Sequence, residues 1–465
     1  MSQSMESPVL DGGQLQAQLE TLAAQAGISQ WDLGASCSTD TSVQVDRGEP
    51  KQMKGAERRA VTVRVWNDQG LVGITSTSDL TEAGLARAFE GAKEASAFGN
   101  PEEIPAFSPL AKAPLPALEQ PLMESSSILH LLDRLKDAER DLLASHGAIS
   151  TVPYNGLAQR RSERVYLNSE GVLRHQQLST ASLYLYARAE ETGRKPRSSG
   201  AVRLAYGVEG LDVAGCIAEA AQRTMSHLNY APIATGRYTC VFSPEAFLDL
   251  IGAFSSLFNA RAVLDGVSLS TRESLGEVLA APFFSLKDNG LHSGNIGAAL
   301  FDGEGTPTAP LTLIDGGVLR HFLHSEATAR TFGVSPTGHA GMGAKVSVAP
   351  DWFEVAPTPG VAGGEEGLDR FAPDARRAGE GGLVVIDSLS ALHAGVKASQ
   401  GAFSLPFDGW LVQGGEAVSI ESATVAGDIR SVLMNLVGFE GPSKVTPSGL
   451  CPWVWVEGLT VTGDA

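Results

Sequence analysis

Apolar residues recur along this chain with two spacings, one that follows the helical turn and one that alternates with every second position. The first spacing is typical of a helix with one buried face, and the second of a half-buried strand. Asp79 is expected to cap a helix that continues through Phe98. Before it, the pattern predicts a helix over Gln14–Ala26, strands over Trp31–Cys37 and Thr41–Val45, and a hairpin of Ala60–Trp66 with Leu71–Thr75. We therefore predict a small α+β domain over residues 1–100.

A proline-rich segment, residues 101–122, separates this domain from a second one. Clustered prolines favour extended, semi-rigid backbone, so the segment is predicted to be a linker. Over residues 123–235 the spacing predicts the helices Ser125–Ser145 and Leu211–Met225 and the strands Ala148–Tyr154, Arg164–Asn168 and Val172–Arg188. This order predicts a second α+β domain.

The remaining residues, 236–465, are predicted to form a third domain in which strands dominate. Its first helix is marked by Ser243, Pro244 and Glu245, which suit an N-cap, a first helical position and a first-turn acid. Strands are expected over Tyr238–Phe242, Leu383–Asp387, Gly409–Gln413, Ala417–Ile420 and Val454–Val461, with short helices near 368–378 and 429–436. The predicted fold class is α+β, with two small N-terminal domains and a large β-rich C-terminal domain.

Candidate chemistry concentrates in the stretch from Phe301 to Gly341. It begins with a glycine-containing loop that carries two carboxylates, Asp302 and Glu304. The pattern then predicts a hairpin of Leu311–Ile314 with Val318–Leu323 around an Asp-Gly-Gly turn, and a short helix over Ser325–Arg330. Four of the nine histidines lie in or beside this stretch: His292, His321, His324 and His339.

The two loop carboxylates admit two interpretations. Asp302 and Glu304 are two positions apart, so in an extended loop both would face the same way and could share a proton or hold a cation or a peptide amine. The other interpretation is turn chemistry, in which the aspartate binds nearby backbone and the glycines supply positive φ. The residues alone do not decide between them.

No complete catalytic set is visible in the sequence. A helical zinc-protease site needs histidines one turn apart beside a glutamate, and no histidine here is followed by glutamate. His321 and His324 are three positions apart, so on a strand one would be packed and the other exposed. No serine lies in a Gly-x-Ser-x-Gly motif, and the glycines before Lys345 lack the spacing of a phosphate loop.

Composition limits the class of partner and the compartment. The 35 basic and 53 acidic residues give a net charge of −18, which disfavours nucleic-acid binding. No apolar run approaches the length of about 18 residues that a membrane span needs. The polar, acidic N-terminus argues against a secretory signal, and four widely spaced cysteines are typical of a reduced, cytoplasmic protein.

Several short motifs, in order, resemble the TldD/PmbA family, long labelled modulators of DNA gyrase and understood as metallopeptidases. They are Val165–Gly171, Phe301–Thr308, Leu313–Leu319, Thr328–Arg330, Ala426–Asp428, Pro447–Leu450 and Leu459–Gly463. The resemblance implies that the C-terminal domain is mainly antiparallel. It also implies a protease-family function, proteolysis of unfolded peptides.

The family has two branches, and the missing motif places this chain with one of them. TldD-like members carry a helical His-Glu-x-x-x-His zinc motif, whereas TldE (PmbA)-like members lack it and pair with a TldD-like subunit around an internal chamber. This chain has no His-Glu dipeptide, and Cys451 does not match the family's cysteine ligand. The resemblance therefore implies a zinc-less subunit of a heterodimer, with no catalytic or metal-binding residue of its own and with zinc in the partner.

The loop and histidines are the expected contacts with peptide substrate or partner: Asp302, Gly303, Glu304, Gly305, Thr306, His321, His324 and His339. Two other functions remain open. One is a non-enzymatic, protein-binding regulator. The other is an autonomous metal-dependent hydrolase in which Asp302, Glu304, His321 and His339 surround a metal. Homodimer formation also remains open.

Overall fold

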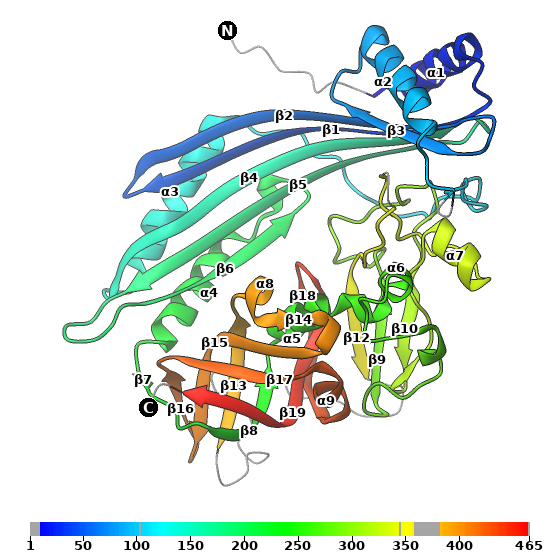
Figure 1. The fold of residues 1–465 in the computed structure, drawn as a ribbon. Helices are drawn as coiled ribbons and strands as arrows, with labels where there is room; N and C mark the ends of the chain where they lie inside the picture. Colours follow the sequence, from blue (N-terminus) through cyan, green and yellow to red (C-terminus); the bar gives the residue numbers. More distant parts are fainter. Residues whose placement is uncertain (1–9, 102–103, 344–345, 358–381, 464–465) are drawn as a thin grey trace.

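Two β-sheets dominate the computed structural model of the chain, and the long strands of the first arch over the C-terminal part (Figure 1). The structure describes residues 10–101, 104–343, 346–357 and 382–463. The predicted helix near 368–378 lies outside these residues. The α+β class, with a large, mainly antiparallel C-terminal part, is confirmed.

The first sheet has six antiparallel strands in the order β3-β2-β1-β4-β5-β6. It joins strands from both predicted N-terminal segments, because β1 pairs with β2 on one side and with β4 on the other. The strands are β1 (Gln30–Asp46), β2 (Glu49–Trp66), β3 (Val72–Thr77), β4 (Ile149–Asn168), β5 (Leu173–Ala189) and β6 (Arg197–Ala205). Here β1 and β4 are each one continuous strand where the pattern predicted two, and β6 was not predicted.

Four helices cover one face of this sheet: α1 (Gly12–Ala26), α2 (Glu82–Ser96), α3 (Ile128–Ala144) and α4 (Val213–Ser226). Along β1, Leu33 and Ala35 are buried in the core with α1 and α2, and Val43 and Val45 in the core with α3 and α4. All four are odd-numbered positions of one strand, so both helix pairs cover the same face. The even-numbered face at the α1–α2 end is left to contact the C-terminal part.

The second sheet contains thirteen strands, and β11-β10-β9-β12-β19-β8-β13-β15-β16-β7 is its main path. Most pairs are antiparallel; β12–β19, β8–β13 and β7–β16 are parallel. The strands are β7 (Tyr230–Ala231), β8 (Gly236–Phe242), β9 (Phe284–Asp288), β10 (Leu311–Asp315), β11 (Val318–Leu319), β12 (Phe353–Pro357), β13 (Leu383–Leu389), β14 (Val396–Lys397), β15 (Ala402–Gln413), β16 (Glu416–Ile420), β17 (Ala423–Asp428), β18 (Leu436–Thr446) and β19 (Gly449–Gly463).

Short helices connect and cover these strands: α5 (Pro244–Ala253), α6 (Ala260–Leu264), α7 (Glu326–Phe332), α8 (Leu392–Gly395) and α9 (Ile429–Met434). Helix α5 begins as predicted, with the Ser243 hydroxyl accepting from the Ala246 N–H and proline at the first turn. None of the helices in the described part of the chain combines the length and the apolar character that a bilayer crossing requires.

Two predicted boundaries were wrong: the start of helix α2 and the end of the second strand of the central hairpin. Helix α2 is capped by Thr81, not by Asp79, because the Asp79 carboxylate instead accepts from the backbone and hydroxyl of Thr81. The second strand of the central hairpin ends at Leu319 rather than Leu323, since the Leu323 N–H donates to Phe258 O and leaves the ladder.

Candidate functional site

A cavity of about 400 Å³ lies where the even-numbered face of the first sheet meets the loops of the C-terminal part. The sheet contributes small residues of β1 and β2 together with Arg164 of β4. The loops contribute Asp302, His339 and Asp351. Arg164 links the two sides, because its Nη2 donates to Phe301 O at 2.5 Å and its guanidinium lies over the Phe301 ring. The volume is within the range of about 300–1,000 Å³ that is usual for ligand sites.

The loop that carries Asp302 is a tight turn and not the extended segment of the first interpretation. The Asp302 N–H donates to Thr306 O at 2.9 Å, and Gly305 has φ +76°. Asp302 Oδ1 accepts from the N–H groups of Glu304 and Thr306, each at 2.9 Å, and Oδ2 accepts from the Ala340 N–H at 3.0 Å. Asp302 therefore performs the turn chemistry of the second interpretation while also lining the cavity.

Glu304 does not share a hydrogen-bond partner with Asp302. Its side chain is fully buried, and Oε2 accepts from the Glu326 N–H at 2.7 Å at the start of α7. The other oxygen, Oε1, has no hydrogen bond and lies 4.0 Å from Arg64 Nη1. Burial raises the pKa of this carboxyl to about 8, and the Asp302 charge adds to the rise while Arg64 opposes it.

Arg64 is itself held in a buried ion pair with Asp32. Its guanidinium binds the Asp32 carboxylate twice, at 2.9 Å and 2.5 Å, and the Tyr166 hydroxyl donates to the same carboxylate at 3.1 Å. Both charged side chains are at most 1% exposed. Burial opposes the charged form of Arg64, but the charge and hydrogen bonds of Asp32, together with the charges of Glu304 and Tyr166, outweigh burial and leave the pKa above its usual value.

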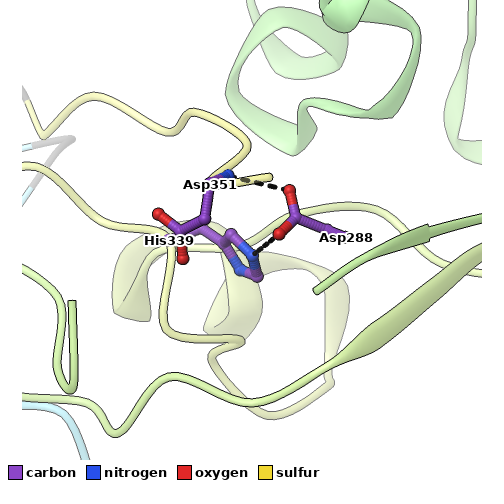
Figure 2. A group of neighbouring side chains, drawn as sticks. All are labelled: Asp288, His339 and Asp351. Carbon is purple, nitrogen blue, oxygen red and sulfur yellow. Dashed lines mark hydrogen bonds and ion pairs between the residues drawn. The ribbon is translucent and has the colours of Figure 1, made fainter. Parts of the chain in front are cut away.

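Three potential metal ligands lie close together beside the cavity: Asp288 at the end of β9, His339, and Asp351 just before β12 (Figure 2). His339 and Asp351 line the cavity. One ligand atom from each lies within 4.8 Å of those of the other two. His339 Nε2 is 3.4 Å from Asp288 Oδ1, and Asp288 Oδ2 accepts from the Asp351 N–H at 2.8 Å. Asp288 and His339 are buried, whereas Asp351 is exposed.

Charge within this group shifts its pKa values. Burial lowers the pKa of His339, but the adjacent Asp288 carboxylate, together with the charges of Asp351 and Asp302, outweighs burial and leaves the pKa raised. Burial and the charges of Asp288 and Asp302 raise the pKa of Asp351 to about 6, against the opposing effect of His339.

The structure brings three of the predicted contact residues to this cavity: Asp302, Gly303 and His339. Gly303 is required there, since a Cβ would lie 2.3 Å from the Met342 backbone N. The Gly305 backbone instead packs against the Tyr166 ring, and the buried Thr306 hydroxyl donates to Ser108 Oγ at 2.8 Å. Neither residue lines the cavity.

The other two histidines also lie away from it. His321 is exposed and its Nδ1 lies 2.8 Å from Thr312 O, whereas His324 is buried against the Phe332 ring. Burial, with the nearby His321 and His339, lowers the pKa of His324 to about 4. One of these two histidines is exposed and the other is packed, as the spacing predicted for a strand, but neither residue lies on a strand.

Sequence reasoning missed Arg164, Asp288 and Asp351. Each follows or precedes an ordinary apolar run, and only tertiary contacts between segments far apart in the chain bring them to His339. The available signal was weak: Asp288 ends an apolar stretch that was not predicted as a strand.

Three family models match most of the chain. They are described as PmbA/TldA metallopeptidase domain 1 (residues 31–96), central domain (residues 123–228) and C-terminal domain (residues 235–463). Metalloprotease PmbA of Escherichia coli O157:H7 is 23% identical over 451 residues, which cover 93% of this chain and 92% of the relative. A PmbA homologue of Haemophilus influenzae is 24% identical over 433 residues, 90% of this chain and 88% of the relative.

Solved structures agree with this fold. A proposed modulator of a DNA gyrase from Thermotoga maritima is 25% identical, with a TM-score of 0.80 over 97% of this chain and 100% of its own. TldE of Thermococcus kodakarensis superposes with a TM-score of 0.83 over 96% of this chain and 100% of its own. Its 18% identity makes this a likeness of fold alone.

Proposed function

This chain belongs to the PmbA/TldD metallopeptidase family, and on that basis we propose that it is the zinc-less, TldE-like subunit of a two-chain peptidase. A TldD-like partner supplies the zinc, and the two chains enclose a chamber in which unfolded peptides are cleaved. The observation that carries the proposal is the lack of any His-Glu dipeptide in the whole sequence.

The donor groups of this chain do not fit the family's helical zinc motif. That motif needs two histidines on one helix, and within the described residues no helix carries two histidines. The group at the cavity has one imidazole and two carboxylates, from three separate segments. We therefore assign this chain no step at the zinc, which in the partner would polarise the peptide carbonyl.

The part left to this chain is to hold the substrate and to form a wall of the chamber. Arg164 and Asp302 line the 400 Å³ cavity and offer charged groups to a peptide. A second cavity, of about 1060 Å³, lies between β6 and α4 on one side and α5 and β13 on the other. The first volume lies within the range of about 300–1,000 Å³ that is usual for ligand sites, and the second lies just above it. The four buried, unbridged cysteines support a reducing, cytoplasmic compartment.

The test is reconstitution with the chain that carries the zinc motif. We expect the purified chain to hydrolyse an unfolded casein-type substrate no faster than buffer, and activity to appear when a TldD-like partner is added. The matched control is the same mixture with the partner's zinc motif disabled, which should be inactive. Hydrolysis by the isolated chain would instead favour an autonomous hydrolase. A stable complex in which neither chain cleaves peptides would favour a protein-binding regulator.

A further inference from the structure

The imidazole of His339 is held with one nitrogen available as a metal ligand. Thr337 Oγ1 donates its hydroxyl proton to His324 O at 3.2 Å and accepts from the His324 N–H at 2.7 Å. With the hydroxyl proton directed to His324 O, Thr337 Oγ1 accepts from His339 Nδ1–H, 2.9 Å away. In the neutral imidazole, the lone pair is therefore on Nε2, which has no hydrogen bond although its side chain is fully buried.

The Asp288 carboxylate is also held in one orientation by backbone N–H groups. Its Oδ2 accepts from the Asp351 N–H at 2.8 Å, and its Oδ1 lies 3.4 Å from the Trp352 N. These backbone groups orient Oδ1 toward His339 Nε2. A lone pair on Nε2 that faces a carboxylate oxygen at 3.4 Å is repulsive unless a proton or a cation lies between the two atoms.

Asp351 completes the group from the solvent side. Its carboxylate takes no hydrogen bond from the rest of the described chain, and it opens onto the 400 Å³ cavity. The cavity supplies an entry path and room for water at the remaining coordination positions. A buried imidazole, a fixed carboxylate and a reachable carboxylate thus surround one point.

We propose that Asp288, His339 and Asp351 bind a divalent metal ion. With oxygen donors in the majority and one imidazole, the site suits a cation of the Mn²⁺ type, completed by water. Thr337 acts as a positioning residue, because it fixes the ring and its tautomer. The competing arrangement is a simple ion pair between protonated His339 and Asp288, with no affinity for metal.

The experiment titrates Mn²⁺ into the metal-stripped full chain and follows loss of the free-ion signal by electron paramagnetic resonance. We expect one Mn²⁺ per chain. Asp351→Asn and His339→Asn should each weaken binding by about tenfold or more, since each removes a ligand. Thr337→Val should weaken binding by about tenfold, because it removes the hydroxyl that holds the His339 ring. Circular dichroism and the melting temperature establish that each variant is folded.

Matched controls are Asp315→Asn and His321→Asn, which change an exposed aspartate and an exposed histidine outside the cavity. Both should bind Mn²⁺ as the wild type does. Failure of the wild type to bind, or equal binding by folded Asp351→Asn and His339→Asn variants, would overturn the site. The readout does not use peptidase activity or a partner, so its outcome is independent of the proposed function.

Discussion

Replacing Arg64 with alanine is expected to destabilise the folded chain by about 3–5 kcal/mol, the usual cost of removing one partner from a buried ion pair. The change would leave the Asp32 carboxylate buried and negatively charged. Of the Arg64 guanidinium and the Tyr166 hydroxyl that bind this carboxylate, only the hydroxyl would remain. It would also remove the cation nearest to Glu304 Oε1. Urea denaturation followed by circular dichroism measures the change in the free energy of unfolding.

The matched control is Arg140→Ala, which removes an exposed pair with Asp137 on the solvent side of α3. Exposed pairs are weak and screened, so no measurable change is expected there. A double variant, Asp32→Asn with Arg64→Met, should be less destabilised than Arg64→Ala, because it removes both charges. Equal stabilities for Arg64→Ala and Arg140→Ala would contradict this account of the buried pair.

A second large effect is expected from Glu304→Gln, and it depends on pH. The folded-state pKa of Glu304 is about 8, above the ordinary value of 4.5, so the folded state holds this proton more tightly than the unfolded state. The contribution of this carboxyl to the stability of the fold is therefore fully present below the unfolded-state pKa of 4.5, and it is lost as the pH rises through the folded-state pKa of about 8. At about 1.4 kcal/mol per pKa unit, the loss is on the order of 5 kcal/mol.

Glutamine cannot ionise, so the variant should lack this part of the pH dependence. As the pH rises from about 5 to about 9, the stability of Glu304→Gln should therefore increase relative to that of the wild type. Urea midpoints at the two pH values measure this difference. Glu20→Gln, an exposed change on α1, is the control and should follow the wild type at both. If the free energy of unfolding of Glu304→Gln changed with pH in parallel with that of the wild type, the Glu304 carboxyl would ionise normally in the folded chain, which would contradict this prediction.

Local patterns predicted most helices and the central hairpin because these depend on residues close in sequence. Helix α1, for example, differs from its predicted start by two residues, and the β10–β11 turn follows from its Asp-Gly-Gly sequence. The continuous β1 was missed because the polar stretch near Asp40 breaks the apolar alternation. In the structure that stretch is paired on both sides, with Arg58 and Arg160 near the Asp40 carboxylate.

The candidate site was predictable only in part. The concentration of histidines and carboxylates pointed to the stretch that contains Asp302, Gly303 and His339, and these three residues line one cavity. The roles of Asp302 and Glu304 could not be separated by sequence, because they depend on burial against another segment of the chain. Asp288 and Asp351 reach His339 through the pairing of β9 with β12, a long-range contact that local spacing does not encode.

The most direct test of the two-chain account is native mass spectrometry of this chain, tagged and isolated from its own cells at its natural level. The account predicts a complex of one copy of this chain with a TldD-like chain. Zinc should be present in that complex and should stay with the partner when the two are separated. A homodimer or monomer of this chain that carries zinc by itself, with no TldD-like chain, would contradict the account.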